Sequence, residues 1–226
     1  MTVAIDGPAG AGKSAVARGA ARALGFVHID TGALYRSVAL AVLRAGAPTG
    51  DGAAVAACLP GIALDVRFAE GAQHVYVNGE DVTGAIRTPE VSMATSDVSA
   101  HPCVRAFLLE LQRSLARERD CILDGRDIGT VVLPQAEVKI FLTATPEERA
   151  RRRWLELLAK GMEESYEKVL VEVLARDEQD SSRGAAPLKQ ARDALLLDST
   201  GMNEAQTAQA VIEIIQQKRR NHEQNK

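Results

Sequence analysis

Short apolar runs recur along the chain and alternate with longer stretches of helical periodicity. The runs lie at residues 3–6, 26–29, 121–124, 138–142 and 195–198. Runs that are apolar on both faces are typical of strands buried inside a parallel sheet. Because helical segments separate most of them, we predict an α/β fold, with a five-stranded parallel sheet and helices on both faces.

Helix starts can be identified between these runs. Thr145 is followed by Pro146 and, three residues on, by Glu148, which predicts an N-cap, a proline at the first helical position and a capping box. Thr88 and Pro89 predict a similar start without the box. Residues 14–24 and 204–219 have helical spacing, and the second of these segments is amphipathic.

The region 61–91 departs from this α/β rhythm. Residues 64–68 and 74–77 alternate apolar and polar positions on either side of a glycine-containing turn. This pattern predicts an antiparallel hairpin. We therefore expect an inserted subdomain at 61–91, mounted on a core made of residues 1–60 and 92–226.

Composition and charge argue against several classes of protein. The chain has 226 residues and a formal net charge of −3, which argues against nucleic-acid binding through bulk charge. Three widely spaced cysteines do not indicate a disulfide framework or a zinc site. No segment has the length of a membrane span and no leader pattern opens the sequence, so we expect a cytoplasmic protein. No heptad or long apolar stripe demands a partner, and a monomer is expected.

A glycine-rich loop follows the first apolar run. Residues 7–14 read Gly-Pro-Ala-Gly-Ala-Gly-Lys-Ser, between a predicted strand and a predicted helix. Converging backbone N–H groups hold phosphates in such loops, since glycine lets the backbone curl closely around them. Lys13 would reach the β- and γ-phosphates, and Ser14 would hold Mg²⁺. The alternative is a glycine-rich turn with no ligand.

Asp124 ends the run at 121–124 and is a second candidate for chemistry. In a phosphate-loop protein such an aspartate lies near Mg²⁺ and its waters. A strand-end aspartate that caps the next turn is the competing interpretation. Arg126 and Asp127 follow between two glycines, where ligands gather at the carboxyl ends of parallel strands.

Arginines form the third group of candidates. Arg176, Asp180 and Arg183 are spaced to share one helix face, as either a surface ion-pair stripe or a ligand contact. Four more follow the helix start at Thr145, namely Arg149, Arg151, Arg152 and Arg153. These are a solvated basic face or a phosphate-binding lid at about 149–162, which Gly161 would end and hinge. Arg36 and Arg105 are ordinary surface residues or further anion ligands.

Several of these segments together resemble one family. They are the loop at 5–14, Asp-Thr-Gly-Ala-Leu-Tyr-Arg at 30–36, Ile-Arg-Thr-Pro-Glu-Val at 86–91, Val104–Arg105, Gln112–Arg113, Asp-Gly-Arg-Asp-Ile-Gly-Thr-Val-Val at 124–132, Lys-Ile-Phe-Leu at 139–142, Glu148–Arg149 and Arg176–Asp177. The chain resembles the bacterial cytidylate kinases nearly from end to end. The loop is shared by many phosphate-loop proteins, whereas the segment at 124–132 is specific to this family.

The resemblance implies phosphoryl transfer from ATP, with Mg²⁺, to CMP and dCMP. It implies nucleotide contacts at Gly7, Pro8, Ala9, Gly10, Ala11, Gly12, Lys13, Ser14 and Ala15, and metal contacts at Ser14 and Asp124. Substrate contacts are implied at Thr31, Arg36, Ser96, Arg105, Arg126, Asp127, Arg176, Asp180 and Arg183. Catalytic roles are implied for Lys13, Arg126, Arg183, Arg149, Arg152 and Arg153.

Within these sets the resemblance also assigns individual roles. Arg36, Arg105 and Arg126 would hold the phosphate of the acceptor monophosphate. Ser96, Arg105 and Asp127 would lie near the cytosine. Arg176 and Asp180 would contact the sugar and phosphates, and Arg183 and the lid arginines would close over the transferring group.

Two other classes compete with this assignment. A GTPase or switch protein should carry an Asn-Lys-x-Asp or Thr-Lys-x-Asp guanine reader, and the sequence has neither. A kinase for another small acceptor, such as shikimate or a different monophosphate, shares the loop and the lid. Only the segment at 124–132 and the hairpin insertion argue against that second class.

Overall fold

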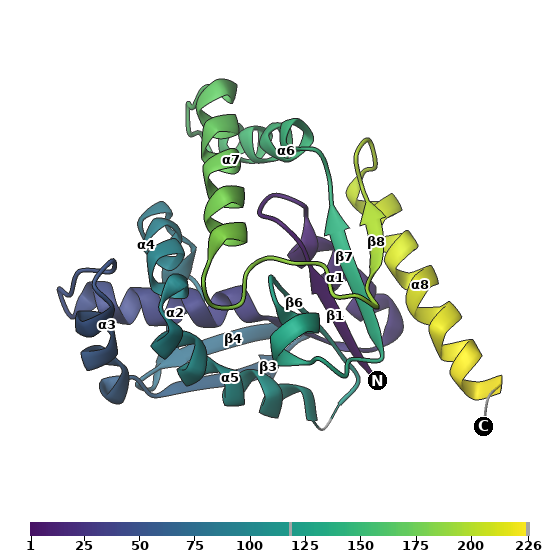
Figure 1. Cartoon of the computed structure of the whole chain (residues 1–226), viewed down its shortest axis with the longest axis horizontal. Coiled ribbons are helices and arrows are strands. Elements are labelled where there is room, and N and C mark those ends of the chain that lie inside the picture. The colour runs from purple at the N-terminus through teal and green to yellow at the C-terminus, as the bar shows by residue number, and fades with distance from the viewer. Residues whose placement is uncertain (118, 225–226) are drawn as a thin grey trace. The chain divides into compact units, whose positions relative to one another are not determined.

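The chain divides into two compact units in a computed structural model, which describes residues 1–117 and 119–224. The first unit joins Met1–Val27 to the C-terminal part that begins at Arg119, and the second begins at His28. Figure 1 labels most of the helices and strands of both units. Each unit is described by itself below.

A five-stranded sheet, which lies in the first unit except for residues 28–30, confirms the predicted fold class. Its strands, in spatial order, are β2 (Val27–Asp30), β6 (Cys121–Gly125), β1 (Thr2–Asp6), β7 (Val138–Thr143) and β8 (Leu195–Asp198). β1 pairs in parallel with β6 and β7, and Ile5 is opposite both Asp124 and Ile140. The carboxyl ends of these central strands therefore meet at one edge, where the phosphate loop begins.

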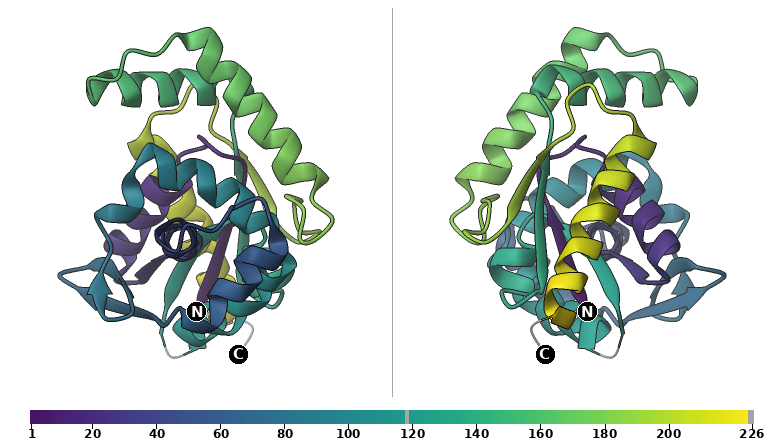
Figure 2. Two further views of the ribbon diagram at one scale, coloured as in Figure 1. Left: turned by 90° about the vertical axis from the view of Figure 1, so that its left-hand side faces the viewer. Right: turned by 90° about the vertical axis from the view of Figure 1, so that its right-hand side faces the viewer.

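Four helices accompany this sheet in the described residues. They are α1 (Lys13–Leu24), α6 (Pro146–Ala159), α7 (Tyr166–Ser182) and α8 (Glu204–Gln224). α8 packs along α1, as the right-hand view of Figure 2 shows, and its Val211 and Ile215 complete the apolar core beneath β1 and β7. α6 and α7 pack against each other, and the rings of Trp154 and Tyr166 meet edge to face with centroids 6.3 Å apart.

The predicted N-cap and the glycine stop of α6 are confirmed, but the predicted capping box does not form. The Thr145 amide donates to the Thr200 hydroxyl at 3.0 Å, and the Glu148 carboxylate pairs with Arg151 and Arg152 instead. The Thr145 hydroxyl accepts a hydrogen bond from the Glu148 amide at 3.3 Å, as an N-cap does. At the other end Gly161 has a φ of +73°, and its amide donates to the carbonyl of Leu158. This left-handed residue ends the helix where glycine was predicted to end it.

The second unit packs helices around a small antiparallel sheet. Its elements are α2 (Thr31–Arg44), α3 (Gly52–Cys58), η1 (Leu59–Gly61), β3 (Leu64–Ala69), β4 (Ala72–Val77), β5 (Glu80–Asp81), η2 (Ala85–Arg87), α4 (Pro89–Ala100) and α5 (Pro102–Arg117). The predicted hairpin is confirmed, with Val66 opposite Val75. Thr88 caps α4 through the Val91 amide, which confirms that helix start as well.

The core of this unit explains why it is wider than the insertion expected at 61–91. Val75 and Val77 of the hairpin are buried against α2, which contributes Leu34 and Val38. α4 and α5 add further apolar side chains to the same cluster. A two-stranded ribbon has too little apolar surface to be stable alone, so the hairpin needs the helices on both sides of it in the sequence.

Two expectations drawn from composition concern cysteines and membrane spans. Cys58, Cys103 and Cys121 are free thiols, and burial raises the pKa of Cys121 to about 11. Among the residues that the structure describes, none of the helices combines the length and the apolar character that crossing a membrane requires.

Candidate active site

The loop predicted to bind phosphate connects β1 to α1. At Gly7 the φ angle is +151°, and a Cβ atom there would lie 1.9 Å from the carbonyl oxygen of Leu142. Gly12 caps α1 with a φ of +84°, in the left-handed region that favours glycine. No side chain caps the first turn of α1 in the described structure, so its N–H groups present partial positive charge to the loop. This backbone form is that of an anion site at a helix N-terminus.

Lys13 folds back over the loop. Its ammonium group donates to the carbonyl oxygen of Pro8 at 2.8 Å, and only 6% of the residue is exposed. Burial, together with the charge of Arg126, lowers the pKa of Lys13 well below its ordinary value, while Asp124 and Asp180 oppose the shift. A polyanion bound in the loop would favour the charged form of Lys13.

Ser14 and Asp124 meet beside the loop. The Ser14 hydroxyl donates to Oδ2 of Asp124 at 2.5 Å, and Asp124 is 4% exposed. The register of β1 and β6 brings the two together, because Asp124 lies opposite Ile5 at the same sheet edge. The competing interpretation, in which Asp124 merely caps the next turn, does not account for this contact with the loop.

The donor set of Ser14 and Asp124 fits magnesium. Both supply hard oxygen atoms, and among the described residues there is no cluster of three or more carboxylate, imidazole or thiol groups that could hold a metal alone. Mg²⁺ is commonly held by one or two protein groups, with waters and substrate phosphates completing its shell. The residues present therefore fit Mg²⁺ that arrives with a nucleotide.

The segment after β6 contains Arg126 and Asp127 and then forms η3 (Ile128–Val132), a single π-helical turn. Asp127 is 4% exposed and precedes this turn. The first N–H groups of the turn donate to another residue, Asp6 at the end of β1. Ile128 donates to Oδ1 of Asp6 and Gly129 to Oδ2, both at 2.7 Å.

Asp6 was not predicted from the sequence as a site residue. Burial raises its pKa to about 6, against the opposing effect of the two N–H groups, and the nearby charge of Asp127 adds to the rise. The sequence does show a carboxylate directly before the phosphate loop. Its hydrogen-bond partners could not be identified, because they lie more than 120 residues away in the sequence.

Arg126, Asp180 and Arg183 form a buried ion-pair cluster. Arg126 Nε donates to Oδ2 of Asp180 at 2.8 Å, and Arg183 donates to Oδ1. Asp180 is 1% exposed and the Arg183 side chain 7%, so the surface stripe considered for Arg176, Asp180 and Arg183 is wrong for these two members. Burial works to raise the pKa of Asp180, but the charges of Arg126, Arg183 and Arg176 outweigh it and hold that pKa below its usual value.

Arg149, the first of the four lid arginines, is buried beneath the phosphate loop. It is 3% exposed and forms a bidentate pair with Asp177, at 2.9 and 2.5 Å. It also donates to the carbonyl oxygens of Ala9, in the loop, and Ala144, at 3.0 and 2.9 Å. Arg149 thus connects α6 and α7 to the loop backbone.

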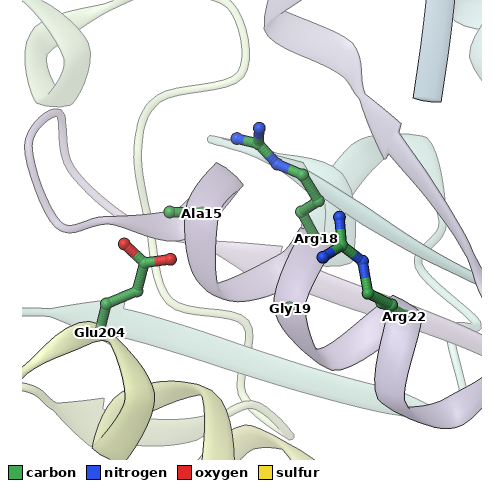
Figure 3. Close-up of a pocket in the computed structure, with 5 residues that line it drawn as sticks. All are labelled: Ala15, Arg18, Gly19, Arg22 and Glu204. Carbon is green, nitrogen blue, oxygen red and sulfur yellow. The ribbon is translucent and has the colours of Figure 1, made fainter. Parts of the chain in front are cut away.

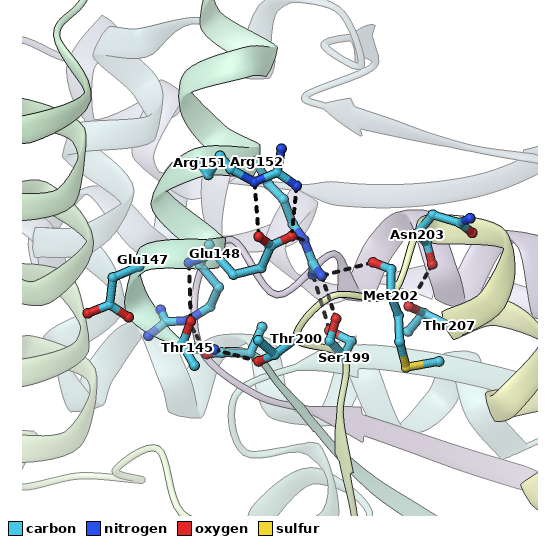
Figure 4. Close-up of polar contacts among 12 residues, drawn as sticks. Thr145, Glu147, Glu148, Arg151, Arg152, Ser199, Thr200, Met202, Asn203 and Thr207 are labelled. Atoms are coloured by element: carbon cyan, nitrogen blue, oxygen red, sulfur yellow. Dashed lines mark hydrogen bonds and ion pairs between the residues drawn. The ribbon is translucent and has the colours of Figure 1, made fainter.

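Arg152 connects α6 to the segment between β8 and α8. Its guanidinium donates to Oε1 of Glu148 at 2.9 Å, to the Ser199 hydroxyl and carbonyl at 3.1 and 2.6 Å, and to the Met202 carbonyl at 3.1 Å. Figure 4 shows this network, with Arg151 on the same glutamate. The network joins the base of α6 to the loop that starts α8.

Each lid arginine therefore has a carboxylate partner. Arg151 pairs with Glu148 and Arg153 with Glu156, at 3.0 Å in each case. Carboxylates on α6 and α7 therefore compensate the charge of the four guanidinium groups, so their clustering does not by itself indicate a bound anion. Arg151 is the exposed member of the set, and Arg153 is partly exposed.

In the second unit an ion-pair cluster stands at the start of α2. Asp30 caps that helix through the Ala33 amide and pairs with Arg36 and Arg87, at 2.7 and 3.1 Å. Burial works to raise the pKa of Asp30, but the charges of Arg36 and Arg87 keep it below its usual value. Arg87 had been given no role from the sequence. The cluster gathers two guanidinium groups on one buried carboxylate.

The other residues predicted for the acceptor lie on the helices of the same unit. Thr31 opens α2 and is 2% exposed, and Ser96 is on α4. Arg105, on α5, lies over the ring of Tyr35 at 5.5 Å and donates to the Ser99 carbonyl at 3.3 Å. α2 packs against both α4 and α5, so these helices share one core.

A cavity of about 360 Å³ lies between α1 and α8. Ala15, Arg18, Gly19, Arg22 and Glu204 line it. In Figure 3 Glu204 extends from the start of α8 toward α1, which carries the two arginines. Ala15, at the end of the predicted nucleotide-binding segment, borders this cavity.

The predicted residues fall into two groups. The first unit brings Lys13 within electrostatic range of Asp6, Asp124, Arg126 and Asp180, around the phosphate loop. The second unit contains Thr31, Arg36, Ser96 and Arg105. Arg152 and Arg153 also lie in the first unit, but their contacts are on α6 and the segment before α8 rather than in the cluster around Lys13.

Known proteins are similar to this chain over nearly its whole length. The family described as cytidylate kinase matches residues 3–217. A curated cytidylate kinase from Geobacter sulfurreducens is 51% identical over 225 residues, covering 97% of this chain and 94% of that protein. Another, from Carboxydothermus hydrogenoformans, is 50% identical over 218 residues, covering 96% of this chain and 98% of its own.

Among solved structures, an uncharacterized protein from Eubacterium ventriosum matches with a TM-score of 0.51 and 10% identity, covering 96% of this chain and 98% of that one. This likeness concerns the fold alone. The family match over nearly the whole sequence, the phosphate loop, and the buried cluster around Lys13 lead to one conclusion: the chain belongs to the cytidylate kinase family of phosphotransferases.

Proposed function

We propose that this protein transfers the γ-phosphoryl group of ATP to CMP and dCMP, with Mg²⁺, by in-line displacement. Family membership supports the reaction class. The observation that carries the residue roles is the cluster of Lys13, Asp124, Arg126 and Asp180 around the phosphate loop. Phosphoryl transfer passes through a loose transition state, which needs alignment and charge stabilisation more than covalent help from the protein.

The loop at residues 7–15 would hold the phosphates of ATP. Its open N–H groups would face the β- and γ-phosphates, and Lys13 would add a charge that burial has already separated from bulk water. Ser14 and Asp124 would hold Mg²⁺, which supplies neutralisation of phosphate charge when bound. The short contact between their oxygen atoms supports this pairing.

Arg36, Arg105 and Arg126 would hold the phosphate of the acceptor. Arg36 and Arg126 each already pair with a buried carboxylate, which holds its guanidinium in one orientation. The nucleophile is an oxygen of the acceptor phosphate, which is anionic near neutral pH. No general base is needed for that reason.

Asp127, with Ser96 and Arg105, would recognise cytosine. A carboxylate accepts a hydrogen bond from the amino group of cytosine, whereas uracil carries a carbonyl at that position. Asp127 is 4% exposed, so a mismatched base would leave a charge with little compensation from water. Sites built around such hydrogen bonds can discriminate by about 10⁴-fold or more.

Asp180 and Arg176 would contact the sugar and phosphates, and Arg183 the transferring group. The buried ion pairs of Asp180 with Arg126 and with Arg183 support one common site for Asp180, Arg126 and Arg183. Thr31, at the buried start of α2, would complete the acceptor pocket.

The lid arginines would divide into two kinds. Arg149 and Arg152 would act as positioning residues, because their guanidinium groups are already occupied by carbonyl and carboxylate oxygens. Arg153 pairs with an exposed carboxylate, Glu156, which a phosphate could displace at small cost. Arg153 is therefore the lid residue that we expect to contact nucleotide.

Coupled ADP release with ATP and Mg²⁺ tests the function. CMP, dCMP, UMP, AMP, GMP, dTMP and shikimate would be compared side by side. We expect strong turnover with CMP and dCMP and weak turnover with the others. A better acceptor elsewhere in the panel would contradict the cytosine site while leaving the phosphate loop in place.

Replacing Asp127 with asparagine tests the base contact directly. The preference for CMP over UMP should fall, since an amide can also donate to the carbonyl of uracil. Asp65→Asn, an exposed change on the hairpin, is the control and should leave the preference intact. An unchanged preference in Asp127→Asn would exclude this residue as the base reader.

A monomer without a nucleic-acid partner, located in the cytoplasm, stays a prediction from composition and charge.

A further inference from the structure

Asp6 has no role in the proposed mechanism, although it lies beside the phosphate loop. It ends β1 and directly precedes Gly7, the first residue of the phosphate loop. Asp6 is 4% exposed. A buried carboxylate needs hydrogen-bond donors to compensate its lost hydration, so its partners show what it holds in place.

The donors come from the segment that carries Arg126 and Asp127. Each oxygen of Asp6 accepts one backbone N–H, from Ile128 and from Gly129, and both distances are 2.7 Å. These groups begin the turn η3. Asp127 is at the N-cap position of this turn, yet its side chain makes no capping hydrogen bond. Asp6 therefore supplies the cap from another strand, and the Asp127 carboxylate is not used for that purpose.

Lys139 of β7 also lies against this segment, beside Gly129. A Cβ atom built on Gly129 would lie 3.1 Å from Cδ of Lys139 and 3.3 Å from Oδ2 of Asp6. Lys139 is itself held by the carbonyl of Pro134 at 2.6 Å and by the carboxylate of Asp193. Gly129 thus fits closely between two neighbouring strands, and a methyl group there would require Lys139, Asp6 or the turn to shift by a few tenths of an ångström.

We propose that Asp6 is a positioning residue that holds Arg126 and Asp127 in register with the phosphate loop, and so sets acceptor affinity and base selectivity. The backbone that Asp6 anchors begins two residues after Arg126, while its own backbone leads into the loop. One side chain thereby connects the donor and acceptor sides. The inference rests on the proposed role of Asp127 as the cytosine reader.

Asp6→Asn is the direct test. Asparagine has one acceptor oxygen, and its NH₂ group would face a backbone donor, so at most one of the two hydrogen bonds survives. The loss of a charge-assisted hydrogen bond corresponds to about tenfold or more. We expect KM for CMP to rise by about this factor and the CMP-to-UMP ratio of kcat/KM to fall, while KM for ATP stays within about threefold.

A second variant disturbs the same segment and leaves Asp6 intact. Gly129→Ala would push the turn away from Lys139 and Asp6, and it should shift CMP affinity and selectivity in the same direction. Asp51→Asn is the matched control, because Asp51 also caps a turn through two backbone amides, those of Ala53 and Ala54, but is exposed and has no proposed substrate role. It should leave both constants unchanged.

The outcomes separate this inference from the proposed function. If the unaltered protein prefers CMP and Asp127→Asn weakens that preference, the proposed function stands. If Asp6→Asn and Gly129→Ala then lower kcat equally for CMP and UMP, with selectivity unchanged, Asp6 is only a structural residue and the inference is overturned. Should Asp6→Asn fail to fold, Gly129→Ala alone decides by the same selectivity ratio.

Discussion

Replacing Arg149 with lysine should loosen the phosphate loop while keeping the positive charge. The guanidinium makes four hydrogen bonds, two to Asp177 and two to the carbonyls of Ala9 and Ala144. A lysine ammonium at one point cannot reach all three groups, and the site is almost fully buried. If two hydrogen bonds to the charged donor are lost, at about 1.5 kcal/mol each, the free energy of unfolding falls by about 3 kcal/mol.

Thermal unfolding without nucleotide measures this loss. For a chain of this size, 1 kcal/mol corresponds to about 2–4 °C, so the transition should fall by roughly 6–12 °C. KM for ATP should rise more than KM for CMP, since Ala9 belongs to the phosphate loop. Arg151→Lys, on the same helix but 57% exposed, is the control and should change stability by less than about 0.5 kcal/mol. Equal effects of the two substitutions would refute the reasoning.

Three further predictions follow from individual contacts. Gly7→Ala should abolish ATP binding measured by calorimetry, because its Cβ would lie 1.9 Å from the Leu142 carbonyl; retained affinity would contradict the close approach. Ser14→Ala should raise the Mg²⁺ concentration needed for half-maximal activity, since one of the two protein oxygens is lost; an unchanged Mg²⁺ requirement would exclude Ser14 as a ligand. The folded-state pKa of Asp6, about 6, lies above its ordinary value of 3.8, so its contribution to stability is present below pH 3.8 and is lost as pH rises through about 6. Relative to Asp6→Asn, the protein should lose up to about 3 kcal/mol over that range in chemical unfolding, and a constant difference would exclude the shift.

The parallel sheet could be predicted because its strands carry their signal locally. Each is a short apolar run, and a run buried on both faces needs no knowledge of its neighbours to be recognised. The helix start at Thr145 and the helix end at Gly161 are similarly local, since capping depends on residues a few positions apart.

The second unit could not be outlined in the same way. The hairpin around Val66 and Val75 was predicted, but its extent as a compact body depends on packing against α2 and α5, which flank it at a distance in the sequence. A hydrophobic pattern indicates that a face is buried without saying what buries it.

The partners of charged residues could not be predicted from the sequence either. The sequence indicated that Arg149 and Arg152 cluster on one helix, but their partners are Asp177 and Ser199, 28 and 47 residues further along the chain. Asp6 went unnoticed because its partners are the backbone N–H groups of Ile128 and Gly129, more than 120 residues away in the sequence. The motif types could be identified from sequence, whereas the pairing of charges needed the fold.

The pairing of every lid arginine with a carboxylate has a kinetic consequence. The carboxylate in each pair largely cancels the electrostatic potential of the guanidinium at longer distances. The chain as a whole carries a net charge of −3. An approaching nucleotide therefore meets no long-range attraction from this helix, and the capture rate is set by the loop itself. Added salt should screen a weak repulsion rather than an attraction, so association with ATP should quicken slightly with ionic strength, opposite to enzymes that steer their anionic substrates with exposed basic surfaces.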